Sequence, residues 1–163
     1  MALAENAAHQ PAPNGDYLQM LQLVERLHRQ LLDVIKDELE RDGLEDLNSV
    51  QALLLFNIGD QELTAGELRT RGHYLGSNVS YNLKKLVEAG YIRHERSEAD
   101  RRSVRVSLTE TGTAVRVRLK DLFARQGESL APVGGVDQDK LPEVNTALAR
   151  IERFWADHIR FRM

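Results

Sequence analysis

The stretch that decides the fold runs from residue 77 to residue 102 and reads SNVSYNLKKLVEAGYIRHERSEADRR. In its first half, apolar residues recur at the three- and four-residue spacing of one helix face. They are Val79, Leu83, Leu86 and Val87. The other face carries hydrogen-bonding and cationic side chains, which are Ser77, Asn78, Tyr81, Lys84 and Lys85. Gly90 follows the pattern, and glycine commonly ends helices because it adopts positive φ without strain. We therefore expect a helix with one buried face and one polar face.

Two short strand-like runs follow this helix, Tyr91 to Glu95 and Val104 to Leu108. The loop between them carries Arg96, Arg101 and Arg102. A polar helix followed by a basic hairpin is typical of a winged helix-turn-helix, in which the helix enters the DNA major groove and the hairpin tip reaches phosphates or the minor groove. The predicted fold class is mainly α with a small β-hairpin wing.

A second short helix is expected just upstream. Thr64-Ala65-Gly66-Glu67 has the pattern of a capping box, in which the threonine hydroxyl and the glutamate carboxylate each accept a hydrogen bond from a free backbone N–H. It predicts a helix over residues 65–71, and the glycine-containing turn 72–76 then leads to the polar helix. Two short helices joined by such a turn form a helix-turn-helix. The strongly apolar helix expected before them, from Asn48 or Ser49 to Gly59, should form the core.

Long amphipathic helices are predicted on both sides of this domain. Residues 16–41 carry two apolar rows, with Asp16 as the expected N-cap, and a final helix is expected after a cap at Asp137. The predicted organisation is a disordered tail at 1–15, an N-terminal dimerisation arm at 16–46, a winged helix-turn-helix domain at 47–112 and a C-terminal dimerisation arm at 113–163.

The apolar rows of the arms allow two interpretations. They could be buried within their own domain, or against a second subunit. The second is favoured, because the central domain is too small to cover both rows of the first arm, and paired arms most simply form a two-fold dimer. The expected dimerisation residues are Leu27, Leu31, Leu148, Ile151, Trp155 and Phe161.

Composition and charge narrow the function classes. The chain has 163 residues, 42% of them hydrophobic and 29% charged, and no cysteine, which suits a reducing cytoplasm. No apolar run is long enough to span a bilayer, and no signal peptide is expected, so the predicted localisation is cytoplasmic. The net charge is −3, yet residues 64–102 hold eight cations and five anions and are therefore +3, which leaves −6 for the remainder. Local charge, which governs docking on phosphates, thus permits DNA binding.

Nothing in the sequence indicates catalysis or a cofactor. The five histidines are scattered singly, so no metal-ligand spacing emerges. No nucleophile, histidine and carboxylate grouping is evident, and no glycine-rich phosphate loop. The expectation is a protein without enzymatic activity, metal or cofactor.

Three segments resemble the MarR family of bacterial transcription regulators. They are residues 77–86, Gly90-Tyr91-Ile92, and above all the wing sequence DRRSVRVSLTETG at 100–112. The resemblance implies an obligate homodimer and, in many members, a small-molecule pocket where the arm meets the DNA-binding domain. Asn82 departs from the family pattern, which usually has leucine there. A buried Asn82 needs a hydrogen-bond partner, whereas an Asn82 turned outward could contact adenine in the groove.

The predicted DNA contacts fall on the polar helix and the hairpin tip. Base and sugar contacts are expected from Asn78, Ser80 and Tyr81, with Ser77 near a phosphate. Lys84 and Lys85 are expected to contact phosphates; alternatively, Lys84 could pair with Glu88 one helical turn away. The wing contacts are Arg101 and Arg102 in the minor groove, with Asp100 stabilising the loop as its place in the family motif implies.

These residues predict a homodimeric, sequence-specific transcription regulator that binds a pseudo-palindromic operator in double-stranded DNA. Repression is the expected outcome where the operator overlaps a promoter, with release by a small-molecule effector. The alternative is a winged-helix module for protein–protein interaction without DNA binding, which the modest local charge of +3 also permits.

Overall fold

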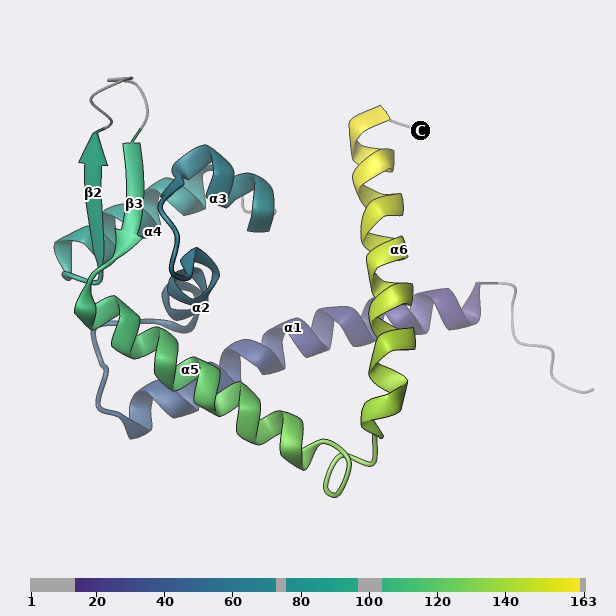
Figure 1. Cartoon of the computed structure of the whole chain (residues 1–163). Coiled ribbons are helices and arrows are strands. Elements are labelled where there is room, and N and C mark those ends of the chain that lie inside the picture. Colours follow the sequence, from purple (N-terminus) through teal and green to yellow (C-terminus); the bar gives the residue numbers. More distant parts are fainter. Residues whose placement is uncertain (1–13, 73–75, 97–103, 162–163) are drawn as a thin grey trace, which may run out of the picture. The chain divides into compact units, whose positions relative to one another are not determined.

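The computed structural model describes residues 14–72, 76–96 and 104–161. In chain order, its elements are α1 (Gly15–Arg41), α2 (Ser49–Ile58), β1 (Leu63–Thr64), α3 (Ala65–Gly72), α4 (Gly76–Glu88), β2 (Ile92–Arg96), β3 (Val104–Leu108), α5 (Glu110–Ser129), the 3-10 turn η1 (Gln138–Lys140) and α6 (Leu141–Phe161). The chain forms two compact units that divide within α5, between Arg116 and Val117. The predicted fold class, mainly helical with a small hairpin, is confirmed (Figure 1).

The first unit is built around a core under three short helices. α2, α3 and α4 gather beside the hairpin (Figure 1). Their buried apolar side chains include Leu54, Leu55, Ile58, Leu68, Val79, Leu83 and Leu86. Burying such side chains is the main stabilising contribution to a domain of this size. α2 is the apolar core helix that the sequence predicted, ending at Gly59, which has φ +65°.

Two capping boxes set where these helices begin. At α3, the Thr64 backbone N–H donates to Glu67 Oε2 at 2.9 Å, and the Glu67 N–H donates to Thr64 Oγ1 at 3.1 Å, as predicted. At α2, Asn48 and Gln51 form a second capping box that was not predicted. Satisfying these otherwise free donors stabilises each helix start by about 1 kcal/mol.

The hairpin belongs to a three-stranded antiparallel sheet of order β1-β3-β2. Val106 on the central strand β3 lies opposite Leu63 on one side and His94 on the other. β2 begins at Ile92 and extends to Arg96, one residue later at each end than predicted. The two-residue strand β1 was not predicted, because a pair of residues carries no alternation and becomes a strand only by pairing with β3.

The long helix α1 differs from the expectation at its start. The N-cap is Asn14, and Asp16 lies inside the first turn, so the prediction that Asp16 caps the helix is wrong. Only Ile35 and Leu39 are buried among its residues, whereas Leu27 is 60% exposed and Leu31 is 37% exposed. The C-terminal part of α1 therefore packs into the first unit, and the rest leaves much of its apolar surface exposed.

The second unit contains α5 from Val117 onward, η1 and α6. Asp137 precedes η1 and makes no capping hydrogen bond with its side chain, and α6 itself begins at Leu141, so the predicted Asp137 cap of the final helix is wrong. Pro142 lies in the first turn of α6, where the missing N–H costs nothing. No residue of α6 is buried, although it carries a continuous apolar stripe.

Candidate DNA-binding surface

Helix α4 presents the two faces that the sequence predicted, except that Val87, expected on the buried face, is 37% exposed. Val79, Leu83 and Leu86 are at most 8% exposed and hold the helix on the core. The outer face is exposed and polar, and it includes all of the predicted contact residues whose side chains the structure describes: Asn78, Ser80, Tyr81, Lys84 and Lys85. Ser77 lies in the first turn of α4. A convex helix with polar side chains outward has the shape and chemistry that a major groove accepts.

Two contacts organise the cationic part of this face. The Lys85 ammonium lies 5.8 Å from the centroid of the Tyr81 ring, a cation–π distance. Lys85 Nζ also lies 3.7 Å from Glu88 Oε2, so the ion pair of Glu88 is with Lys85 and not with Lys84. Lys84 has no ion pair among the described residues. Its ammonium is therefore available for a phosphate.

Asn82 lies at the inner edge of α4 and not on its exposed outer face. Its side chain is half-buried, accepts a hydrogen bond from Gln51 Nε2 at 3.4 Å and donates one to the Asn78 carbonyl at 2.9 Å. The alternative in which Asn82 turns outward to contact adenine is therefore not the one that the structure shows. The predicted wing residues Asp100, Arg101 and Arg102 lie outside the described residues.

The turn after α4 is tied to the rest of the unit by Tyr91. The Tyr91 hydroxyl, 45 residues from Asp46 in the sequence, donates to Asp46 Oδ1 at 2.7 Å. The Thr109 N–H donates to the Tyr91 carbonyl at 3.1 Å, and the Thr109 hydroxyl donates to the Gly90 carbonyl at 2.7 Å. These bonds fix the end of α4 between the α1–α2 loop and the start of α5. No local pattern could have predicted this arrangement.

Tyr91 gives the fold a testable dependence on alkaline pH. Burial, together with the hydrogen bond and negative charge of Asp46, raises the pKa of Tyr91 from 10.0 to about 12. The folded state holds the phenolic proton more tightly, so this stabilisation is present below pH 10 and is lost as the pH rises from 10 to about 12. We expect the free energy of unfolding to fall in that window by up to about 3 kcal/mol more in the wild type than in Tyr91→Phe. Urea unfolding at several alkaline pH values measures it; parallel curves for the two proteins would contradict the assignment.

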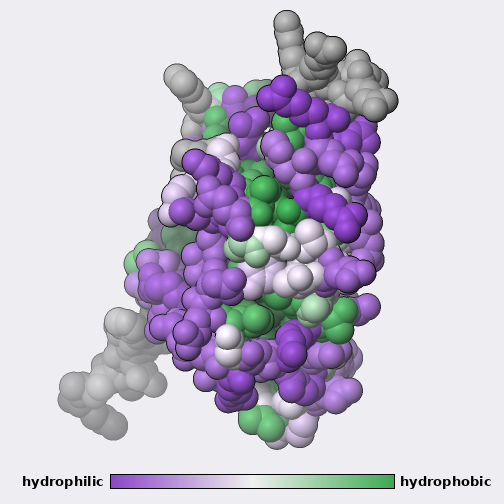
Figure 2. Space-filling model, turned by 90° about the vertical axis from the view of Figure 1, so that its left-hand side faces the viewer, coloured by the Kyte–Doolittle hydropathy of each residue, from purple (hydrophilic) through white to green (hydrophobic). Residues whose placement is uncertain are grey.

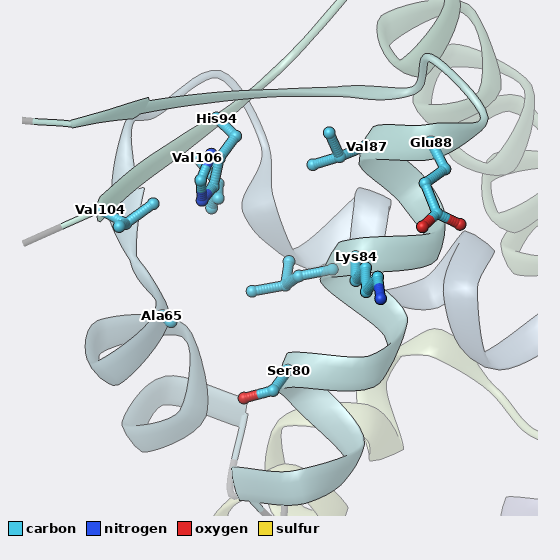
Figure 3. Close-up of a pocket in the computed structure, with 9 residues that line it drawn as sticks. Ala65, Ser80, Lys84, Val87, Glu88, His94, Val104 and Val106 are labelled. Carbon is cyan, nitrogen blue, oxygen red and sulfur yellow. The ribbon is translucent and has the colours of Figure 1, made fainter.

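A cavity of about 370 Å³ lies between α4 and the hairpin (Figure 3). Its apolar lining consists of Ala65, Leu83, Val87, Val104 and Val106. Ser80, Lys84, Glu88 and His94 add polar groups, and the Ser80 hydroxyl points into the space (Figure 3). Figure 2, which faces the hairpin side of the molecule, shows apolar surface enclosed by hydrophilic side chains. A pocket of this size with few polar groups fits a small ligand.

Among residues 14–72, 76–96 and 104–161, no helix is both long enough and apolar enough to cross a membrane. Those residues also contain no group of three or more histidine or acidic side chains that could hold a metal ion.

Comparison with known proteins supports a DNA-binding role. Residues 47–112 match the family model described as a winged helix DNA-binding domain. The chain is also similar to the exopolysaccharide II synthesis transcriptional activator ExpG of Rhizobium meliloti (strain 1021). The two are 36% identical over 145 residues, which are 89% of this chain and 74% of ExpG.

Solved structures share the fold. Streptococcus pneumoniae FabT in complex with DNA superposes with a TM-score of 0.70 at 20% identity, covering 86% of this chain and 98% of FabT. The C80S mutant of MarR from E. coli, complexed with operator DNA, gives a TM-score of 0.69 at 18% identity, covering 86% of this chain and 99% of MarR. At these identities the likeness establishes the fold.

The class of protein follows from the structure and the comparisons together. The structure has an exposed polar helix on an apolar core beside a hairpin, residues 47–112 match a winged helix DNA-binding domain, and ExpG is a similar transcription regulator. The protein is a winged-helix, DNA-binding transcription regulator and not an enzyme. It belongs to the same family of transcription regulators as ExpG, and it shares the fold of the MarR structures, which the resemblance of residues 48–112 implied.

Proposed function

We propose that the protein is a homodimeric regulator that acts in the cytoplasm and binds a pseudo-palindromic operator in double-stranded DNA. The observation that carries this proposal is the outer face of α4. Asn78, Tyr81 and Lys84 are exposed there, while the opposite face is anchored by buried apolar residues. Each subunit would insert α4 into a major groove, with Asn78 and Tyr81 contacting bases and the lysines contacting phosphates. The minor-groove contacts of Arg101 and Arg102, and the loop-stabilising role of Asp100, remain part of the proposal.

Exposed apolar side chains on the two arm helices support the dimer. On α1, Leu27 is 60% exposed, and on α6, Leu148 and Phe161 are 46% and 63% exposed. Apolar surface of this extent is unfavourable in water unless another chain covers it. A two-fold dimer covers the same surface on both subunits and presents two α4 helices to two half-sites.

The experiment that tests this function is the selection of bound fragments from sheared DNA of the source genome. Wild type and an Arg101→Ala/Arg102→Ala variant are compared side by side. We expect the wild type to enrich a short inverted repeat, and the variant to bind that repeat about tenfold more weakly or worse, because two positive charges leave the minor groove.

The alternative outcome of the selection is equally informative. If both proteins are dimeric and neither enriches any sequence, with or without the small-molecule fraction of a cell extract, sequence-specific DNA binding is contradicted. The protein-interaction alternative would then replace it.

We further propose that a small-molecule effector releases the operator, with the cavity between α4 and the hairpin as its site. The pocket implied by the family resemblance lies elsewhere, where the arm meets the DNA-binding domain. An occupant of the α4 cavity would engage the Ser80 hydroxyl and lie beside Lys84, which the DNA also needs (Figure 3). Binding of DNA and of effector would then exclude each other. Adding the small-molecule fraction to the selection should reduce enrichment, and this reduction should be absent in Val87→Trp, whose larger side chain fills the cavity.

The direction of regulation depends on where the operator lies. We propose repression at an operator that overlaps the promoter, because a dimer bound there excludes the polymerase. The relative ExpG is named an activator. Reporter transcription from the selected operator, placed over and then upstream of a promoter, distinguishes the two outcomes.

A further inference from the structure

A chain of hydrogen bonds runs from the start of α2 to the DNA-facing helix α4. Asn48 and Gln51 cap α2: the Gln51 N–H donates to Asn48 Oδ1 at 2.8 Å, and the Asn48 N–H donates to Gln51 Oε1 at 3.2 Å. The Gln51 side chain then donates from Nε2 to Asn82 Oδ1 on α4, at the long distance of 3.4 Å. Asn82 donates in turn to the backbone carbonyl of Asn78, one turn earlier on the same helix. Gln51 is only 8% exposed and is the one buried polar residue among those that the structure describes.

The two ends of this chain fix the orientation of both amides. The Asn48 N–H can only donate, so Gln51 must offer its oxygen there, which leaves its NH₂ group for Asn82. The Asn78 carbonyl can only accept, so Asn82 must offer its NH₂ group there, which leaves its oxygen for Gln51. The Gln51–Asn82 bond therefore has one polarity, and no flipped arrangement satisfies the same partners.

A polar pair at this place is not the choice that stability alone would favour. Asn82 lies on the flank of α4, about 100° around the helix from Tyr81 and on the side facing α2. Two leucines would bury comparable volume there, and replacing a buried polar pair by apolar residues is often neutral or stabilising. The cost here is the capping bond from the Asn48 N–H to Gln51, which a leucine at 51 would lose. Apolar contacts, however, tolerate small shifts of one helix along another, whereas the Gln51–Asn82 bond, already long at 3.4 Å, would be lost if the two helices moved further apart.

We propose that Gln51 and Asn82 are positioning residues that fix the axial position and rotation of α4 on α2, and thereby determine which operator sequence the exposed face selects. The proposal rests on the proposed function. Asn82 is bonded to the turn that carries Asn78, a residue assigned to base contact, so a shift at Asn82 displaces that side chain in the groove. Neither Gln51 nor Asn82 touches DNA in this arrangement.

The same helix start is also attached to the arm. The Ser49 hydroxyl donates to the Leu32 carbonyl of α1 at 2.7 Å, so the first turn of α2 is held between α1 and α4. A displacement of α1 would therefore reach Gln51 and, through it, Asn82. Through this attachment, the position of α1 would influence the position of α4 without any contact between α1 and DNA.

The test uses the full-length protein and the operator that the wild type selects. In Gln51→Leu/Asn82→Leu the hydrogen-bonded pair becomes an apolar pair. We expect this variant to remain folded and dimeric, and to bind non-specific DNA as the wild type does. Its preference for the operator over a scrambled duplex should fall at least about tenfold, because the exposed face is no longer held in one register. A repeated fragment selection should return an altered or degenerate sequence.

Two further variants keep the outcome decisive. Asn82→Ala removes the bridge and leaves the Asn48–Gln51 capping box intact, so it should lose the same preference even if the double variant is unstable. Asp60→Ala removes the ion pair with Arg116, whose Nη1 lies 2.9 Å from Asp60 Oδ1 and which does not involve α4, so it should preserve the operator preference. The proposal is overturned if the bridge variants select the wild-type operator with an unchanged preference. A wild type that selects no operator would instead overturn the proposed function.

Discussion

Gly112→Ala is expected to destabilise the first unit severely. A Cβ atom on Gly112 would lie 2.1 Å from the Tyr91 carbonyl oxygen and 3.1 Å from its carbon. That carbonyl cannot retreat easily, because it accepts a hydrogen bond from the Thr109 N–H, and Thr109 also receives the Gly112 N–H at its hydroxyl. Accommodating the methyl group means separating the start of α5 from the turn that follows α4.

We expect this change to lower the free energy of unfolding by roughly 3 kcal/mol, at the upper end of overpacking effects. Chemical denaturation followed by circular dichroism measures it. DNA binding should fall with the fraction of folded protein, because the same turn holds the end of α4.

The matched control is Gly127→Ala in the same helix. Apart from its chain neighbours and the backbone of its own helix, nothing lies within 4 Å of the position that a Cβ on Gly127 would take. Alanine is favoured over glycine inside a helix by about 1 kcal/mol, so this variant should be slightly more stable than the wild type. Opposite signs for the same substitution would separate steric conflict from helix propensity. Equal and small effects at both positions would show that the contact with Tyr91 is not rigid.

The local features of this fold could be predicted because they depend on residues close in sequence. The two faces of α4 follow from helical spacing, and the α3 capping box from Thr64 and Glu67, three residues apart. Gly90 has φ +81°, as its place after α4 indicated. The capping box of α2 was equally local, since Asn48 and Gln51 have the same spacing, and it could have been identified from the sequence.

What could not be predicted depends on pairing between distant segments. Gln51 and Asn82 are 31 residues apart, and nothing near Asn82 indicates which side of α4 holds its partner. The strand β1 exists because Leu63 pairs with Val106 on β3. Both features affect α4, one by bonding to its flank and the other by completing the sheet beside it. The position of the DNA-facing helix is therefore a tertiary property, although its composition is a local one.

The second large effect is expected from charges on the apolar stripe of α6. Helical geometry places Leu148 and Ile159 on one face, with Ile151 and Trp155 between them. Leu148 and Ile159 are 46% and 76% exposed, so a glutamate at either position does not disturb the interior of the unit. In a dimer that buries this stripe, each glutamate would be a buried, unpaired carboxylate, which costs several kcal/mol.

We therefore expect Leu148→Glu/Ile159→Glu to be a folded monomer. Its operator affinity should fall about a thousandfold, towards the level of non-specific binding, because a monomer engages one half-site. Analytical ultracentrifugation gives the oligomeric state, and fluorescence anisotropy with the selected operator gives the affinity.

The control variant must change the charge of α6 equally without touching the stripe. Arg150→Ala/Arg153→Ala also makes the chain more negative by two charges, and both arginines are exposed about 140° to 200° around the helix from Leu148. This variant should remain dimeric and lose little affinity. A dimeric Leu148→Glu/Ile159→Glu protein would place the subunit interface elsewhere, whereas a monomer that keeps full operator affinity would remove the two-fold half-site arrangement on which the proposed function depends.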